Sequence, residues 1–207
     1  MIPRGHGVPI SFPSPGTPGE GEGGGSSGPS TRPPPQPSPG VPEEGGAPVF
    51  RIGQGYDIHR LQSGGQLILA GIVVADGISP VAHSDGDVAL HAVVDALLGA
   101  IALGDIGEMF PNTDPKWKNA NSRVFVDAAM QEVRKRGLTV VNLDVTILAE
   151  RPKLKEFKQR MIASLTEMVG GSVNVKAGTN EGCDAVGRGE AIAALAVVLL
   201  CKSGSAG

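Results

Sequence analysis

Residues 83–91 read H-S-D-G-D-V-A-L-H, and the apolar run A-V-V-D-A-L-L-G-A follows directly. Ser84 belongs to the residue types that cap helices, and Asp85 and Asp87 suit the positive end of a helix dipole. The stretch therefore predicts a helix over residues 86–102, on which the rest of the chain converges.

Three ionisable side chains share one face of this predicted helix. Asp87, His91 and Asp95 recur every four residues, a spacing that aligns side chains along a helix. Ionisable groups on an otherwise apolar helix indicate a reactive site. The alternative is a partly exposed polar stripe that contains one hydrogen-bonded histidine.

Asp57 and His59 lie two positions apart at the end of a predicted strand, V-F-R-I-G-Q-G-Y. Side chains at positions i and i+2 of a strand point to the same face, so this pair can approach one ion together. With His91 they form an Asp/His/His set, which suits zinc and leaves a fourth position open for a substrate oxygen. On spacing alone, the alternative is two unrelated surface residues.

Five segments in the region 49–202 carry a more specific pattern. In chain order they are R-I-G-Q-G-Y-D-I-H-R-L, A-H-S-D-G-D-V-A-L-H, L-G-D-I-G-E-M-F-P-N-T-D-P, E-R-P-K-L and V-G-R-G-E-A. In their order and spacing they resemble the family of 2-C-methyl-D-erythritol 2,4-cyclodiphosphate synthases of the non-mevalonate isoprenoid pathway. Five ordered segments are far more specific than any one of them.

The resemblance implies a metal-dependent phosphorus–oxygen lyase. Its substrate is 4-diphosphocytidyl-2-C-methyl-D-erythritol 2-phosphate, whose 2-phosphate attacks the β-phosphorus, releases CMP and closes 2-C-methyl-D-erythritol 2,4-cyclodiphosphate. Such a reaction requires positioning and charge neutralisation more than covalent catalysis. The resemblance also implies a homotrimer with active sites between subunits and a central cavity that can bind an isoprenoid diphosphate.

Two metal sites are implied by the same resemblance. Zn²⁺ binds Asp57, His59 and His91, where it acts as a Lewis acid on a phosphate oxygen. Mg²⁺ or Mn²⁺ binds Glu181 together with the substrate diphosphate, an ordinary arrangement for magnesium. Taken alone, Glu181 is also compatible with a solvated turn acid.

The family's catalytic positions, which stabilise the moving phosphate charge, fall on His83 and Thr179. Substrate positions cover the methylerythritol pocket, the phosphate-binding loop, the central-cavity arginine and a cytidine pocket (residues 149–155) that the neighbouring subunit supplies. They are Asp57, Ile58, His59, His83, Ser84, Asp105, Ile106, Gly107, Phe110, Pro111, Asn112, Thr113, Asp114, Ala149, Glu150, Arg151, Pro152, Lys153, Leu154, Lys155, Gly178, Thr179, Asn180, Glu181 and Arg188.

Some positions depart from the family pattern. Gly178 stands where a threonine is common, Asn112 where an aspartate is common, and Ala185 where an aromatic residue often lies. These departures affect details of phosphate and axial-ligand binding and leave the zinc set untouched. Arg188 and Glu190 match a charged pair near the family's central cavity, and a plain surface ion pair is the alternative.

Composition separates the two ends of the chain from its middle. Residues 1–48 hold 13 of the 17 prolines and almost no large apolar residues, which predicts a disordered Pro/Gly-rich extension of low complexity. Residues 49–202 suit one domain with its own core, and residues 203–207 a flexible tail. Strands alternating with amphipathic helices predict an α+β fold, a two-layer domain with helices on one face of a mixed sheet.

Several partners and compartments are disfavoured. A net charge of −3 without a basic cluster argues against nucleic acid, and no apolar run approaches the roughly 20 residues of a membrane span. The extension carries Arg4 and Arg32 against four glutamates and lacks an apolar leader segment, so import and secretion are both disfavoured. We expect a cytoplasmic enzyme with reduced cysteines, with the plastid stroma as the alternative if the extension is a transit peptide.

The remaining segments predict the following elements. The run Q-L-I-L-A-G-I-V-V, followed by Asp76–Gly77, predicts a strand or hairpin that returns towards the His83 stretch, and G-D-I-G-E-M-F-P-N-T-D-P predicts a loop. Helices are expected from Asn121 or Ser122 to Gly137 and over 154–169. Strands are expected at V-V-N-L-D-V-T-I-L-A, S-V-N-V-K-A-G-T and A-I-A-A-L-A-V-V-L-L.

Three functions are compatible with these residues. A cyclase releases CMP and incorporates no solvent oxygen. A zinc phosphohydrolase uses a water nucleophile and does incorporate it. A non-catalytic trimer that binds isoprenoid diphosphates leaves the retention of the three zinc ligands and Glu181 unexplained, and the cyclase is the function that the motifs favour.

Overall fold

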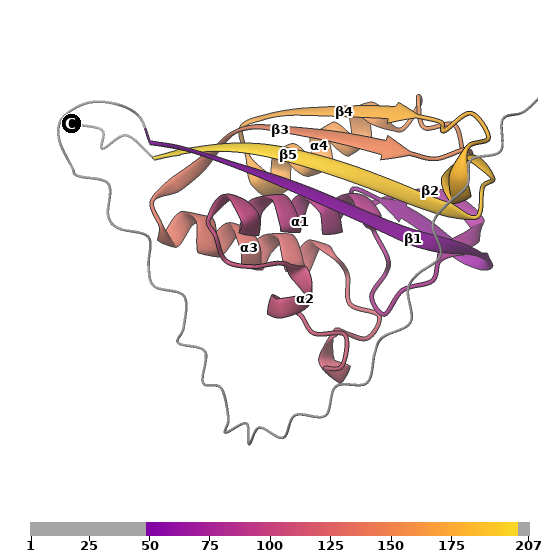
Figure 1. Cartoon of the computed structure of the whole chain (residues 1–207), viewed down its shortest axis with the longest axis horizontal. Coiled ribbons are helices and arrows are strands. Elements are labelled where there is room, and N and C mark those ends of the chain that lie inside the picture. The colour runs from indigo at the N-terminus through magenta and orange to yellow at the C-terminus, as the bar shows by residue number, and fades with distance from the viewer. Residues whose placement is uncertain (1–48, 203–207) are drawn as a thin grey trace, which may run out of the picture. The chain divides into compact units, whose positions relative to one another are not determined.

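A five-stranded mixed sheet forms one layer of the computed structural model, which describes residues 49–202. The predictions for residues 1–48 and 203–207 lie outside the described residues. The strands follow the order β2-β1-β5-β3-β4 (Figure 1). Only β3 and β4 pair in parallel, and the other neighbours are antiparallel. The strands are β1 (Phe50–Leu69), β2 (Ile72–Pro80), β3 (Leu138–Leu148), β4 (Ser172–Gly178) and β5 (Ala191–Lys202).

The helices form the second layer. Helix α1 packs against β1 and β5, α3 packs against α1, and α4 packs against β4, so the long helices lie on one face of the sheet (Figure 1). The predicted α+β arrangement is thereby confirmed. The helices are α1 (Val88–Ala100), α2 (Ile106–Met109), α3 (Arg123–Lys135), α4 (Lys158–Val169) and α5 (Asp184–Gly187), with a 3₁₀ turn at Pro115–Trp117.

The two faces of the sheet differ in exposure. On the helix side of β3, Leu143, Val145 and Ile147 are buried in the core, as the strand's period of two requires. The opposite face of β1 presents Ile52, which is 72% exposed, and Tyr56, which is 48% exposed. The face away from the helices therefore carries large apolar side chains open to solvent.

Two glycines allow α1 to rest directly on β1. A Cβ atom at Gly53 would lie 1.9 Å from the carbonyl oxygen of Ala96, and one at Gly55 would lie 2.0 Å from that of Ala92. No other residue type fits at this separation. Because the alternation of β1 continues from Gly55 to Asp57 on the same face, this close approach brings the N-terminal half of α1 beside Asp57.

The first strand is longer than predicted. The sequence pattern places Asp57 and His59 at the end of a strand and predicts a strand or hairpin in the run that precedes Asp76–Gly77. In the structure β1 continues to Leu69, the hairpin turns at Ala70–Gly71, and Asp76–Gly77 lies within β2. The predicted hairpin is confirmed. The predicted strand end is wrong, because Gly64 and Gly65 form an irregularity within the β1–β2 pairing and do not end the strand.

The start of α1 also corrects the prediction. Gly86 has a φ of +71°, which is incompatible with the first turn of a helix, and α1 begins at Val88. The cap is Asp87, whose side chain accepts a hydrogen bond from the Leu90 N–H at 3.1 Å. Ser84 is not the cap, because its hydroxyl accepts from the Gly86 N–H.

The later helices agree with the sequence except at particular ends. Helix α3 begins at Arg123, and Gly137 follows it with a φ of +66°, as expected for a helix stop. Helix α4 begins at Lys158 rather than at residue 154, because Leu154 anchors a separate turn in the core. The predicted loop after α1 contains the short helix α2 and the 3₁₀ turn. None of the helices in residues 49–202 has the length and apolarity needed to cross a membrane.

Candidate metal centre

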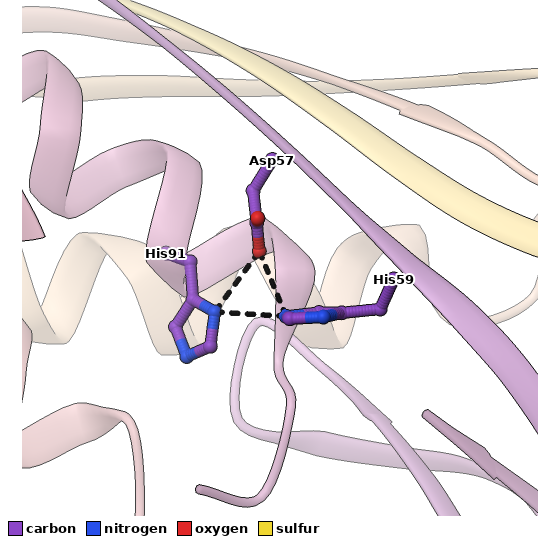
Figure 2. Close-up of side chains that lie close together, drawn as sticks. All are labelled: Asp57, His59 and His91. Carbon is purple, nitrogen blue, oxygen red and sulfur yellow. Dashed lines mark hydrogen bonds and ion pairs between the residues drawn. The ribbon is translucent and has the colours of Figure 1, made fainter. Parts of the chain in front are cut away.

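Asp57, His59 and His91 form a compact cluster where α1 crosses β1 (Figure 2). Asp57 Oδ2 lies 3.0 Å from His59 Nε2 and 2.9 Å from His91 Nδ1. The two ring nitrogens are 3.1 Å apart. Three ligand atoms from two elements distant in sequence therefore converge on one point.

The donor set fits a divalent transition metal. Two imidazoles and one carboxylate are typical zinc ligands, and ligand atoms about 2.0–2.1 Å from a tetrahedral ion lie roughly 3.3 Å apart. The observed separations of 2.9–3.1 Å are close to that spacing. The side chains are largely buried, with 24% exposure for Asp57, 19% for His59 and 10% for His91.

The charges of the cluster reinforce one another. Burial by itself raises the pKa of Asp57, but hydrogen bonds and charge attraction from His59 and His91 outweigh it, so the pKa falls well below the ordinary value. Burial by itself lowers the pKa of His91, and the hydrogen bond and charge of Asp57 reverse this and raise it. A cation bound by the cluster would replace the His91 proton as the positive charge next to the Asp57 carboxylate.

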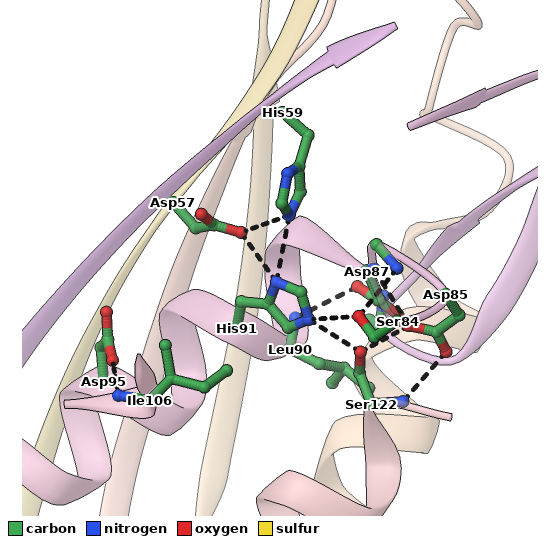
Figure 3. Close-up of polar contacts among 12 residues, drawn as sticks. Asp57, His59, Ser84, Asp85, Asp87, Leu90, His91, Asp95, Ile106 and Ser122 are labelled. Atoms are coloured by element: carbon green, nitrogen blue, oxygen red, sulfur yellow. Dashed lines mark hydrogen bonds and ion pairs between the residues drawn. The ribbon is translucent and has the colours of Figure 1, made fainter. Parts of the chain in front are cut away.

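The other two acids of the predicted stripe have separate roles (Figure 3). Asp87 is fully buried and accepts hydrogen bonds from the backbone N–H groups of Ala70 and Gly71, which ties the hairpin turn to α1. Burial raises its pKa to about 6 against these bonds. Asp95 accepts from the Ile106 N–H at 2.8 Å. Of the three residues, only His91 belongs to the cluster.

A cavity of about 520 Å³ opens beside the cluster, a volume within the range of small-molecule sites. It brings together many of the predicted substrate positions with aromatic residues that the sequence patterns did not single out. The predicted residues are Asp57, His59, His83, Ser84, His91, Ile106, Gly107, Phe110, Pro111 and Asn112, and the unpredicted ones are Val81, Ala82, Trp117 and Phe125.

The aromatic wall of this cavity is a packed trio. Phe110 lies 4.6 Å from Phe125 and 5.2 Å from Trp117 between ring centroids, and Phe125 also lies 6.1 Å from the His91 ring. Phe125 comes from α3, so no motif around Phe110 points to it. Trp117 follows the Asn112–Asp114 segment, and its large side chain was the one signal in the sequence that could have indicated a place in the cavity wall.

A second cavity of about 310 Å³ is lined by five of the seven predicted cytidine-pocket positions, and Glu150 and Arg151 do not line it. It shares no lining residue with the first. Lys158, at the start of α4, adds a third lysine that sequence reasoning missed. The lining residues are Ala149, Pro152, Lys153, Leu154, Lys155, Lys158, Ala177, Gly178 and Thr179.

Glu181 lies beyond this second cavity in an exposed turn. Its carboxylate accepts a hydrogen bond from the Thr179 hydroxyl at 2.7 Å. The neighbouring Asn180 N–H donates to Glu150. Neither Thr179 nor Glu181 lines the cavity at the Asp/His/His cluster, so within one chain the two predicted metal positions lie apart.

The remaining predicted positions lie outside both cavities. Ile58 is 43% exposed on the opposite face of β1 from Asp57. Asp105 and Asp114 cap α2 and the 3₁₀ turn through the Glu108 and Lys116 N–H groups, and Thr113 is exposed in the loop between them.

A third cavity, of about 480 Å³, is lined in part by Glu150, Arg151 and Arg188. The guanidinium of Arg188 forms two hydrogen bonds with Glu190, at 2.9 and 3.0 Å.

Residues 50–201 match the family model described as the YgbB family. The chain belongs to the YgbB family. This YgbB-family protein is 48% identical over 158 residues to the 2-C-methyl-D-erythritol 2,4-cyclodiphosphate synthase of Bordetella pertussis, which covers 75% of this chain and 98% of the relative. It is 47% identical to the chloroplastic enzyme of the same name from Arabidopsis thaliana, over 74% of this chain and 68% of that one.

Solved structures agree with these relatives. A 2-C-methyl-D-erythritol 2,4-cyclodiphosphate synthase in a CDP-bound form matches with a TM-score of 0.67 at 40% identity, over 72% of this chain and 99% of the other. The family and the synthase function that the five segments implied are thereby confirmed.

Proposed function

We propose that this YgbB-family protein is a zinc-dependent phosphorus–oxygen lyase whose metal ligands are Asp57, His59 and His91. It converts 4-diphosphocytidyl-2-C-methyl-D-erythritol 2-phosphate to 2-C-methyl-D-erythritol 2,4-cyclodiphosphate and CMP. The observation that carries the proposal is the convergence of three suitable ligand atoms, at most 3.1 Å apart, at the wall of a cavity of about 520 Å³.

The reaction forms one P–O bond and breaks another within a single substrate molecule. An oxygen of the 2-phosphate bonds to the β-phosphorus, and the oxygen that bridged the two phosphorus atoms leaves with CMP. A metal ion on the three ligands would supply Lewis-acid polarisation of a phosphate oxygen. The protein must otherwise align the reacting groups and neutralise charge.

The cavity beside the cluster suits the methylerythritol phosphate end of the substrate. His83 is exposed at its wall and can donate a hydrogen bond to a phosphate oxygen. The Ser84 hydroxyl and the backbone of Ile106 and Gly107 offer polar groups to the diol, while Phe110 covers its carbon skeleton. The Asn112–Asp114 segment and Asp105 complete this half of the proposed site.

The lysine-lined cavity suits the nucleotide end. Lys153, Lys155 and Lys158 supply positive charge beside Thr179, and the CDP-bound relative supports a cytidine nucleotide as ligand. We assign the residue 149–155 segment to cytidine recognition and Thr179 to stabilisation of the moving phosphate. Glu181 would hold Mg²⁺ or Mn²⁺ against the diphosphate.

A complete site requires a second copy of the chain. The two cavities share no lining residue, and the outer face of the sheet exposes Ile52, Tyr56 and Val197. We propose that these faces meet in a homotrimer, so that the metal half of one subunit adjoins the cytidine half of the next. Arg188 would then lie near a central cavity that can accept an isoprenoid diphosphate.

The proposal extends to the location of the protein and to the ends of the chain. We propose a cytoplasmic location, and the chloroplastic relative supports the plastid stroma as the alternative. Residues 49–202 would form the catalytic domain, flanked by the low-complexity extension 1–48 and the tail 203–207.

A single experiment separates the cyclase from a hydrolase. The full chain is incubated with zinc, magnesium and the substrate in ¹⁸O-labelled water, and the products are weighed by mass spectrometry. We expect CMP and a cyclic diphosphate without ¹⁸O. His91→Ala should abolish the product, whereas Asp127→Asn, an exposed change on α3, should not. Products that carry ¹⁸O, or equal turnover by the His91 variant, would contradict the proposal.

A further inference from the structure

The side of the His91 ring away from the cluster contacts two serines, one of which is hydrogen-bonded to an aspartate (Figure 3). His91 Nε2 lies 2.9 Å from Ser122 Oγ and 3.2 Å from Ser84 Oγ. The Ser122 hydroxyl donates a short hydrogen bond to Asp85 Oδ1, and the Ser122 N–H donates to Asp85 Oδ2 at 3.0 Å. A continuous chain of contacts thus joins Asp85, Ser122, His91 and the proposed metal position.

The chemistry of these groups determines the direction of the hydrogen bonds. A carboxylate only accepts, so the single hydroxyl proton of Ser122 points to Asp85. The Ser122 oxygen must then accept from His91, which places the ring proton on Nε2. When the ring is neutral, Nδ1 therefore carries a lone pair toward Asp57 and His59, which is the tautomer that a metal ligand requires. The proton that Nδ1 shares with Asp57 in the metal-free protein is the one that a metal would displace.

Ser122 makes this contact instead of the one expected of its position. It directly precedes α3, where a serine side chain ordinarily caps the helix, yet it makes no capping hydrogen bond. The Asn121 side chain accepts from the Arg123 N–H at this helix start. Ser122 is fully buried, and its hydroxyl is directed to His91 and Asp85.

We propose that Ser122 and Asp85 are positioning residues that hold His91 in its metal-binding tautomer and orientation. The proposal rests on the proposed metal centre and adds two residues that belong neither to the Asp/His/His cluster nor to the lining of the adjacent cavity. Backbone hydrogen bonds also join the segment before α1 to the segment before α3. The Asp85 N–H donates to the Ala120 carbonyl, and the Asn119 N–H donates to the His83 carbonyl. The loop that carries His83 is therefore fastened to the same unit that orients His91.

The test measures metal binding rather than turnover. Zinc affinity is determined on the full chain by competition with a chromophoric chelator, and the visible spectrum of the cobalt(II)-substituted protein reports the ligand geometry. Ser122→Ala should weaken zinc binding about 10–100-fold, the range typical of lost contacts behind a metal ligand. Ser122→Thr, which keeps the hydroxyl, should recover most of the affinity and the wild-type cobalt spectrum.

Asn121→Ala is the matched control. It removes a side-chain contact at the same helix start but touches neither His91 nor Asp85, so its zinc affinity should equal that of the wild type. If Ser122→Ala folds poorly, Asp85→Asn decides the question. It keeps the volume, removes the charge, and should weaken zinc binding at least several-fold.

The outcomes separate the two proposals. A wild-type chain that binds no zinc would overturn the metal centre and the positioning role with it. The positioning role alone would be overturned if the wild type binds one zinc ion per chain and the zinc affinity of Ser122→Ala, or of a folded Asp85→Asn, lies within twofold of the wild-type value. A lower melting temperature of metal-free Ser122→Ala at unchanged zinc affinity would identify a purely structural serine.

Discussion

The Asp/His/His cluster and the Thr179–Glu181 turn differ in how completely the chain builds them. The cluster is largely buried, its three ligand atoms lie within 3.1 Å of one another, and Ser122 and Asp85 support it from behind. Glu181 is exposed, and the contact it makes is with its neighbour Thr179. One half of the proposed site is therefore pre-organised by the fold, whereas in our proposal the other half is completed only by substrate and a neighbouring subunit.

The largest expected effect is on the pre-organised half. His91→Ala removes one of three ligands, so zinc binding should fall by more than the roughly 10–100-fold of an outer contact, and cyclisation should nearly vanish. The fold and assembly should persist, because the core packing comes from other residues. Metal content by mass spectrometry and product analysis measure the effect. Stoichiometric zinc with a normal rate in the variant would refute the cluster as the metal centre.

The second effect concerns pH. The raised pKa of His91 means that zinc must displace a proton, so zinc affinity should fall about tenfold per unit as the pH drops below that pKa. In the metal-free protein, by contrast, stability should decrease as the pH rises. Its stabilisation by protonated His91 is fully present below pH 6.5, the ordinary value, and is lost as the pH rises through the raised pKa. Zinc titrations and metal-free melting curves across this range test both signs.

The third effect concerns the cytidine half of the proposed site, which we assign to the neighbouring subunit. An inactive His91→Ala chain, mixed with a chain in which Pro152 and Lys153 are both replaced by glutamate, should recover activity. In random trimers about a quarter of the junctions pair an intact metal half with an intact cytidine half. Native mass spectrometry confirms the mixing. Mixed trimers no more active than either parent would refute the placement of the site between subunits.

The smallest effects come from glycine substitutions in the two regions. Gly55→Ala places a Cβ atom 2.0 Å from the Ala92 carbonyl, so α1 must move, which should cost about 1–3 kcal/mol and weaken zinc binding. Gly178→Ala in the open half meets only a Leu148 methyl at 3.9 Å and should change stability by less than about 0.5 kcal/mol. Thermal and denaturant unfolding compare the two. Equal effects would contradict the difference in packing.

Some features of the protein follow from local sequence alone. The spacing of Asp57 and His59 places both side chains on one face of a strand, because the side-chain period of a strand is two. The apolar residues around His91 predict a buried helix, and Gly137 predicts the end of α3. The five ordered segments identify the family, because their combination is specific even though each motif is short.

Other features depended on contacts between distant parts of the chain. The approach of His91 to Asp57 requires Gly53 and Gly55 to accept the backbone of α1, a separation that no local pattern encodes. Phe125 reaches the cavity from α3, and Ser122 turns its hydroxyl to His91 rather than to its own helix. Local sequence determines which face of an element a side chain occupies. Only tertiary packing decides what lies opposite that face, because the opposing atoms belong to elements tens of residues away.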